Sequence, residues 1–232
     1  ADSSAVTALS ADGRKVAFVT SASFGLTAID EFDGFEFTAD LNFRPDVYVK
    51  DLDTGEVSLI SKFFEGNAAG VVAPYTEFGD IVAMSDDGRY IAYLSRTAID
   101  FEDQNNQVDV HLYDSVRDRT IVVTSGTDLD GFGFGGEVFG FDMSANGDRI
   151  AFLTSFAHDA DDTNEIADVY VADIDLASFT VTSRKRVSEA DGGFEIVDGD
   201  SFAPAISPDG SRVAFLNFGD DVTNLAASAD FD

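Results

Sequence analysis

The chain has 232 residues, 44% of them hydrophobic, and its 44 acidic against 14 basic residues give a net charge of −30. This charge argues against nucleic acid and anionic membranes as partners, because the summed field repels both. The absence of cysteine excludes disulfides and thiolate metal sites, and no run of about 18 apolar residues could span a bilayer.

The acid-rich, lysine-poor composition suits high salt, where a short Debye length weakens the repulsion between like charges. We therefore expect a marine or halophilic source, or a protein that binds divalent cations.

A turn motif recurs along the chain, and each copy is followed by a short apolar segment. The motif reads Ser-x-[Asp/Asn]-Gly, and the segment reads [Lys/Tyr/Arg]-[Val/Ile]-Ala-[Phe/Tyr]-[Val/Leu]. The copies are Ser10 to Gly13 before Lys15 to Val19, Ser85 to Gly88 before Tyr90 to Leu94, Ser144 to Gly147 before Arg149 to Leu153, and Ser207 to Gly210 before Arg212 to Leu216. Because Asp bonds to the local backbone and Gly adopts a positive φ without steric cost, the motif predicts a hairpin turn.

Three copies continue with the pattern Asp-x-Asn-x-x-x-Asp, which leads into a third apolar segment. Its members are Asp40, Asn42 and Asp46, then Asp103, Asn105 and Asp109, then Asp162, Asn164 and Asp168. These side chains either coordinate a cation or bond to backbone amides and shape the loop. We favour the structural interpretation, because a feature of every copy more often maintains the repeat.

A turn and a β-branched segment complete each copy, at Glu56 to Ser61, Thr120 to Ser125 and Phe179 to Ser183. With the short segment before each turn motif, every complete copy holds four predicted strands, and helical periodicity is absent. Apolar residues at consecutive positions, as in Ile150 to Leu153, require burial on both faces of a sheet. The sequence therefore predicts an all-β repeat fold of four-stranded antiparallel blades. The first copy carries extra residues near Phe24 to Glu36, which we expect to form a loop.

These motifs resemble the TolB-type (WD-repeat-like) β-propeller repeats, whose blades read Ser-x-Asp-Gly, Val-Ala-Phe, then Asp-x-Asn and Asp-Val-Tyr-Val. The segment Ser201 to Gly210 is close to the family consensus. The resemblance implies one β-propeller domain or propeller fragment over residues 1–232. Its three complete blades would occupy about 5–62, 80–126 and 139–188, with a partial fourth blade at 201–232.

The fourth copy breaks off at Asp230-Phe231-Asp232, in the Asp-x-Asn place before a missing third strand. Three explanations remain open: a fragment of a longer propeller, an open or four-bladed assembly with a minimal last blade, or a protomer completed by another chain. An unpaired second strand exposes an edge that templates association. We therefore expect a protein partner, or self-association through the incomplete fourth blade.

Two connections between blades fit part of a calcium loop, in which carboxylates surround a hard cation and Gly makes the sharp turn. Both place acidic residues at the third, fifth and last positions of that pattern and Gly at the sixth, but Gly126 and Val187 stand where the first Asp belongs. A plain turn is the favoured interpretation. The candidate metal ligands are Asp128, Asp130 and Glu137 in the first loop and Glu189, Asp191 and Asp198 in the second.

The two histidines give weak signals of chemistry. His111 takes the place of Tyr48 and Tyr170 in the third strand, which predicts packing rather than catalysis. His158 lies in a loop rich in aspartate, where a solvated surface position is the simplest expectation.

The sequence shows no nucleophile elbow, no His-Glu-x-x-His and no phosphate-binding loop. We therefore expect a non-enzymatic scaffold that binds a protein or ligand, extracellular or periplasmic, with calcium as its one candidate cofactor and no catalytic residues. One alternative is a carbohydrate-active lyase or hydrolase with a carboxylate or metal site on the propeller axis. Another is a structural subunit of an extracellular assembly.

Overall fold

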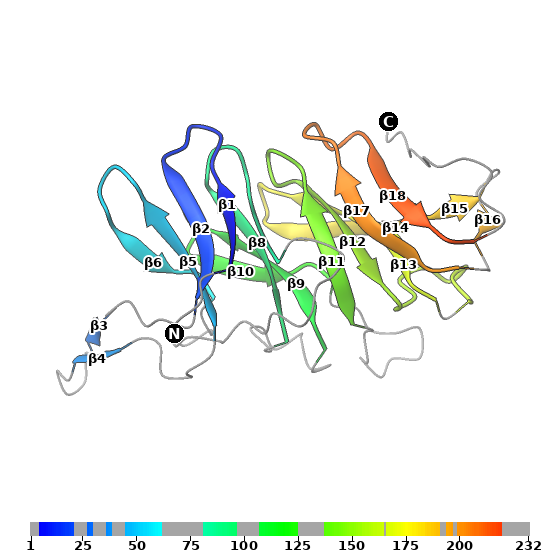
Figure 1. Cartoon of the computed structure of the whole chain (residues 1–232), viewed down its shortest axis with the longest axis horizontal. Helices are drawn as coiled ribbons and strands as arrows, with labels where there is room; N and C mark the ends of the chain where they lie inside the picture. The colour runs from blue at the N-terminus through cyan, green and yellow to red at the C-terminus, as the bar shows by residue number, and fades with distance from the viewer. Residues whose placement is uncertain are drawn as a thin grey trace.

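The computed structural model of the chain (Figure 1) describes residues 5–20, 27–29, 36–38, 45–61, 81–96, 107–124, 137–164, 166–190, 194–196 and 199–219. Over these ranges the regular elements are all β-strands. The described part of the chain holds no helix long and apolar enough to cross a membrane.

Three antiparallel sheets of four strands follow one another along the chain. The first has the order β1 (Ala5–Leu9), β2 (Lys15–Thr20), β5 (Asp46–Asp51), β6 (Val57–Leu59). The second is β7 (Val82–Met84), β8 (Tyr90–Ser95), β9 (Asp109–Asp114), β10 (Arg119–Val122). The third is β11 (Val138–Met143), β12 (Arg149–Thr154), β13 (Asp168–Asp175), β14 (Thr180–Arg186). A fourth sheet holds β17 (Ser201–Ile206) and β18 (Val213–Asn217).

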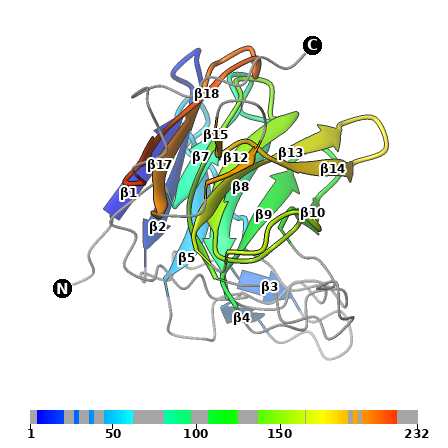
Figure 2. The same ribbon diagram turned by 90° about the vertical axis from the view of Figure 1, so that its right-hand side faces the viewer.

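This arrangement confirms the predicted fold class of three four-stranded blades and a partial fourth. The blades follow one another along the long axis of the molecule (Figure 1). Seen from the side, β1, β7 and β17 lie toward one edge and β10 and β14 toward the other, so the first strands of the first, second and fourth blades share one side (Figure 2). A row of sheets with their first strands on a common side is the geometry of a propeller.

The core lies between the blades, as the runs of consecutive apolar residues require. Every residue of β8 and β9 is buried. One apolar cluster joins the first three blades, and it includes Ile150 and Phe152 of β12. The alternate residues Ala151 and Leu153 belong to a second cluster with the fourth blade. One strand therefore supplies apolar side chains to two seams.

Two short hairpins lie outside the predicted pattern. In the first copy, β3 (Thr27–Ile29) pairs with β4 (Glu36–Thr38), where the sequence predicted a loop. After the third blade, β15 (Glu189–Ala190) pairs with β16 (Phe194–Glu195). Strands of two or three residues are too short to show an alternating pattern in the sequence.

The outer hairpin of the third blade is longer than predicted. Asp173 pairs with Ser183, and a bulge lets β13 continue to Asp175, which pairs with Thr180. Phe179, predicted to begin the outer strand, instead lies in the turn with a φ of 56° and is fully buried. The prediction was wrong here because a bulge adds residues without changing the strand-like composition.

Candidate functional site

The Ser-x-[Asp/Asn]-Gly turns share one hydrogen-bond pattern. The Ser10 hydroxyl donates to Asp12 Oδ1 at 2.7 Å and accepts the backbone N–H of Lys15 at 3.0 Å. Ser85, Ser144 and Ser207 make the corresponding contacts in the later turns. The backbone N–H of Arg14 and the Ser10 hydroxyl both donate to Asp12, and they lower the pKa of its carboxyl. The turn aspartates therefore hold the hairpins in shape.

The same turns connect neighbouring blades. The backbone N–H of Ala11 donates to the Asp86 carbonyl at 2.9 Å, that of Asp86 to Ala145 at 2.7 Å, and that of Ala145 to Pro208 at 2.9 Å. Each bond joins the second residue of one turn to the second residue of the next. The described turns thus form a continuous hydrogen-bonded series.

The last Asp of the Asp-x-Asn-x-x-x-Asp pattern has the same surroundings in three blades. Asp46, Asp109 and Asp168 are at most 1% exposed. Each carboxylate accepts a bond from a hydroxyl just beyond the end of the outer strand, with Ser61 and Thr124 at 2.7 Å and Ser188 at 2.5 Å. The same hydroxyls accept the backbone N–H of Val47, Val110 and Val169. These contacts support the structural interpretation of this position.

The earlier members of the pattern are described in the third blade alone; Asp40, Asn42, Asp103 and Asn105 lie outside the described residues. The Tyr170 hydroxyl donates to Asp162, and an Arg186 guanidinium nitrogen lies 4.0 Å from the same carboxylate. Asn164 donates to the Ile196 carbonyl at 2.7 Å. Burial raises the pKa of Asp168 to about 6, and the nearby Asp162 acts in the same direction. Asp162, Asp168 and Arg186 therefore form a buried polar cluster within one blade.

A second polar cluster lies in the second blade, where β9 ends at Asp114. The Arg89 guanidinium binds both oxygens of Asp114 at 2.9 and 2.8 Å, and Arg117 binds the same carboxylate. Burial acts to raise the pKa of Asp114, but the hydrogen bonds from the two arginines outweigh it and hold this pKa well below its usual range. Asp114 is therefore an ionised anchor for the outer hairpin.

Both histidines are packing residues. His111 is buried and stacks on Tyr93, with ring centroids 5.5 Å apart, as its place in the third strand predicts. His158 is not the solvated loop residue that the sequence suggested, because its ring makes edge contacts with Phe152, Phe156 and Tyr170. Burial lowers its pKa to about 3, which keeps the imidazole neutral at physiological pH. The apolar residues that surround it are distant in the sequence.

The candidate calcium ligands are described only in part. Asp128, Asp130, Asp191 and Asp198 lie outside the described residues. Glu137 pairs with Arg96 at 2.5 Å, and Glu189 lies in β15. Over the part of the chain that the structure describes, no three His, Asp or Glu side chains gather as a metal site.

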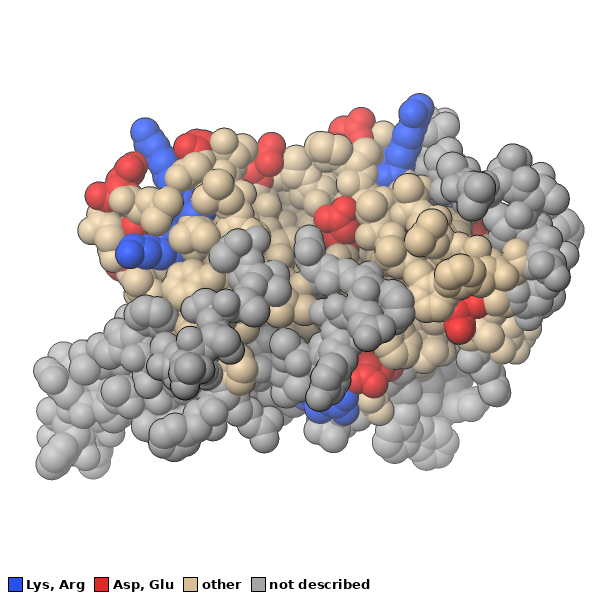
Figure 3. Space-filling model, viewed as in Figure 1, with Lys and Arg blue, Asp and Glu red and all other residues tan. Residues whose placement is uncertain are grey.

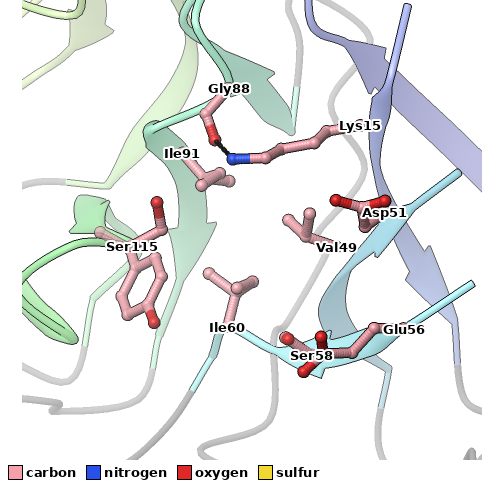
Figure 4. Close-up of a pocket in the computed structure, with 10 residues that line it drawn as sticks. Lys15, Val49, Asp51, Glu56, Ser58, Ile60, Gly88, Ile91 and Ser115 are labelled. Atoms are coloured by element: carbon pink, nitrogen blue, oxygen red, sulfur yellow. Dashed lines mark hydrogen bonds between the residues drawn. The ribbon is translucent and has the colours of Figure 1, made fainter. Parts of the chain in front are cut away.

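A cavity of about 190 Å³ opens in the seam between the first and second blades (Figure 4). Its apolar wall is formed by Val49, Ile60, Ile91 and Tyr113, and its polar rim by Lys15, Asp51, Glu56, Ser58, Gly88 and Ser115. Lys15 Nζ donates to the Gly88 carbonyl at 3.1 Å, which places a cation beside the opening. Asp51 accepts the backbone N–H of Thr54 at 2.8 Å, and this bond lowers the pKa of its carboxyl. The cavity therefore combines an apolar wall with charged groups of both signs.

The equivalent place in the next seam is filled by Phe179. Its ring stacks on Tyr90, the counterpart of Lys15, with centroids 6.1 Å apart. The guanidinium carbons of Arg117 and Arg119 lie 5.6 and 6.0 Å from the centre of the same ring. Asp118 takes the corresponding place in the outer turn of the second blade, with a φ of 48°, and supplies no apolar side chain to the first seam. This cavity was not predicted from the sequence, where the available signal was Asp118 at the turn position that Phe179 takes in the third blade.

Charges of both signs lie close together near the hairpin turns. In Figure 3, described acidic and basic side chains both lie along the upper edge, while most of the described surface below is uncharged. Arg14 contributes to this pattern, with ion pairs to Asp12 at 3.8 Å and Asp53 at 3.4 Å. All three side chains are largely exposed, so these pairs add little to stability.

No protein-family model and no curated protein matches the sequence. Solved structures do match in fold. TolB from Acinetobacter baumannii aligns with a TM-score of 0.50 and 17% identity over 99% of this chain and 41% of that chain. A putative TolB from Agrobacterium tumefaciens aligns with a TM-score of 0.47 and 14% identity over 96% of this chain and 73% of that chain. An oligogalacturonate lyase in complex with manganese aligns with a TM-score of 0.46 and 12% identity over 95% of this chain and 47% of that chain.

The alignment with the Acinetobacter TolB shows the fold, which is that of a TolB-like β-propeller. This chain spans less than half the length of that TolB.

Proposed function

We propose that this propeller is a non-enzymatic scaffold, extracellular or periplasmic, that binds a protein or a small ligand. The observation that carries the proposal is the use of the repeated carboxylates. Those of the turn motif hold hairpins, and those of the third strand bind a hydroxyl just beyond the end of the outer strand. A lyase or hydrolase needs carboxylates that converge on a substrate. The repeated carboxylates instead form hydrogen bonds that stabilise the blades.

The seam cavity beside Lys15 is the proposed binding position. Its volume suits a group of the size of an amino acid or a monosaccharide, and its apolar wall with a few polar groups is typical of ligand sites. The charges on Lys15, Asp51 and Glu56 favour a ligand that is itself zwitterionic or rich in hydroxyls.

Calorimetric titration with free amino acids and monosaccharides tests this proposal. We expect at least one to bind with a Kd below about 1 mM. Ser58→Trp places an indole at the rim and is expected to weaken binding at least tenfold. Thr180→Trp, on the exposed outer strand of the third blade, is the matched control and should bind normally. Product release by the purified protein from oligosaccharides, with or without calcium or manganese, would show an enzyme instead.

We also propose that calcium stabilises the connections between blades, through Asp128, Asp130 and Glu137 and through Glu189, Asp191 and Asp198. Calorimetry after chelation is the test, and Asp128→Asn and Asp191→Asn separate the two loops. Because Arg96 binds one carboxylate oxygen of Glu137, the other carboxylate oxygen is the proposed calcium ligand. A titration without heat, together with an unchanged Tm, would remove both sites.

We further propose that a protein partner binds at the incomplete fourth blade. Among the described residues β18 pairs with β17 alone, whereas β2, β8 and β12 each have a strand on either side. A strand edge without a neighbour is a template for association.

A further inference from the structure

The three seams between blades follow one rule of packing. In each blade, one set of alternate residues in the second strand faces the preceding blade, and the other set faces the following blade. Val213 and Phe215 share a cluster with Ala151 and Leu153 of the preceding blade. The alternate residues Ala214 and Leu216 therefore point away from the third blade.

The turn glycines follow the same rule. A Cβ placed on Gly88 would lie 2.8 Å from Lys15 Cδ, one on Gly147 would lie 3.0 Å from Tyr90 Cβ, and one on Gly210 would lie 3.0 Å from Arg149 Cδ. In each case the first residue of the second strand passes over the glycine of the following blade. Lys15 and Arg149 also donate to the carbonyl of that glycine, at 3.1 and 3.0 Å.

The last blade has a surface that its predecessors bury. Leu216 is 52% exposed, whereas its counterparts Leu94 and Leu153 are 0% and 1% exposed. Phe218, just beyond β18, is 75% exposed. Arg212, the counterpart of Lys15 and Arg149, is exposed and directly precedes β18. We call this surface, formed by Arg212, Ala214, Leu216 and Phe218, the rear face.

The first blade has the complementary surface. Leu9 is 59% exposed, whereas its counterparts Met143 and Ile206 are 9% and 8% exposed. Val16 and Phe18 are half-buried. Among the described residues, no atom lies within 4 Å of a Cβ placed on Gly13, unlike the glycines of the three later turns. We call this surface, formed by Leu9, Gly13, Val16 and Phe18, the front face.

We propose that the rear face of one copy of this chain binds the front face of a second copy, head to tail. The inference rests on the proposal that the fourth blade is a protein-binding surface and names its partner. In this contact Arg212 crosses Gly13 of the partner subunit, and Leu216 packs on the partner's Leu9 and Phe18. The internal seams are the template, since all three join these same two kinds of surface.

Two properties of the assembly follow. The contact is heterologous, because it uses different surfaces on the two copies, so the assembly closes into a ring or grows as a filament. It is also opposed by the charge of −30 on each copy, so association strengthens as salt screens the repulsion.

Sedimentation velocity on the full chain tests the inference, at several protein concentrations and from 0.1 to 2 M NaCl. Gly13→Asn keeps a residue that tolerates positive φ but adds a side chain where Arg212 must pass. We expect this variant to raise the dissociation constant at least tenfold. Gly55→Asn is the matched control, because Gly55 has a φ of 77° and, among the described residues, no atom near its Cβ position; it should associate normally.

The rear face has its own pair of variants. Leu216→Asn is expected to weaken association as strongly as Gly13→Asn. Leu52→Asn is the control, since Leu52 is 50% exposed in the outer turn of the first blade, outside both faces. An equal mixture of Gly13→Asn and Leu216→Asn should form a dimer at the wild-type affinity, because each variant keeps the face that the other lacks.

Three results would overturn the inference. A wild-type monomer throughout the salt and concentration range would exclude the contact, yet leave ligand binding at the cavity untouched. Loss of association in Leu216→Asn alone would show two rear faces meeting each other. Equal effects of the variants and their controls, at unchanged Tm, would place the contact elsewhere.

Discussion

One residue type serves two opposite electrostatic purposes in this repeat. In the exposed turn of the fourth blade, hydrogen bonds from Ser207 and Ser211 lower the pKa of Asp209 to about 2. In the buried third strand, desolvation raises the pKa of Asp168 to about 6. Asp stands at the turn position of three copies and at the start of the third strand of the three complete copies, and the environment decides which form is stable.

Asp168 makes stability depend on pH. Its raised pKa means that the folded state holds a proton more tightly than the unfolded state. Its contribution is therefore complete below about pH 4 and is lost as pH rises through about 6. A shift of about two pKa units corresponds to about 3 kcal/mol.

Urea unfolding of wild type and Asp168→Asn from pH 4 to pH 7.5 measures this effect. We expect the difference between their free energies of unfolding to change by about 3 kcal/mol across the range, with wild type losing stability as pH rises. Asp209→Asn is the control, because Asp209 titrates below this range and its curve should run parallel to wild type. Parallel curves for all three proteins would refute the assignment to Asp168.

The strands differ in how far their sequence determines them. Ser85 to Gly88 encodes its own turn, because the hydroxyl, the carboxylate and the positive-φ glycine make local bonds. The burial of Ile150 to Leu153 on both faces also follows from composition alone. Phe179 could not be placed this way, since its partners Tyr90 and Arg117 belong to another blade. The seam cavity was missed for the same reason, as its walls come from two blades.

Phe179 holds the second seam closed. Its side chain is fully buried and lies against Tyr90 and two guanidinium groups. Phe179→Ala removes these contacts, and we expect it to lower the free energy of unfolding by about 3 to 5 kcal/mol. Guanidinium chloride unfolding measures the change.

A second variant at the same position separates the side chain from the backbone. Phe179→Gly loses the ring as well but relieves the left-handed backbone, which costs a non-glycine residue about 1 kcal/mol. It should therefore be less destabilising than Phe179→Ala. A loss of under about 1 kcal/mol in Phe179→Ala would mean that the ring does not support the seam.

The whole molecule is a row of blades in which each contacts its neighbours. Its stability is therefore close to a sum of blade and seam contributions, set against the repulsion of a net charge of −30. Ion pairs such as Arg14 with Asp12 and Asp53 are exposed and offset little of this repulsion.

Salt is expected to stabilise the fold. The Debye length falls from about 10 Å at 0.1 M to about 3 Å at 1 M, which screens acidic side chains from one another. We therefore expect Tm to rise steadily from 0.02 to 2 M NaCl, as measured by calorimetry. Sorbitol at equal osmolarity is the control and should raise Tm less. An unchanged Tm in both conditions would contradict a role for the net charge.

The hydrogen bonds that join Ala11 to Asp86, Asp86 to Ala145 and Ala145 to Pro208 have a mechanical consequence. Among the described turns, the first and the last are each bonded to one neighbouring turn, whereas the inner two are each bonded to two, so a force applied between the ends of the chain should unfold the outer blades first. The molecule should therefore extend in discrete steps of one blade each. When the force is removed, the unfolded outer blades can refold against the inner blades that stayed folded.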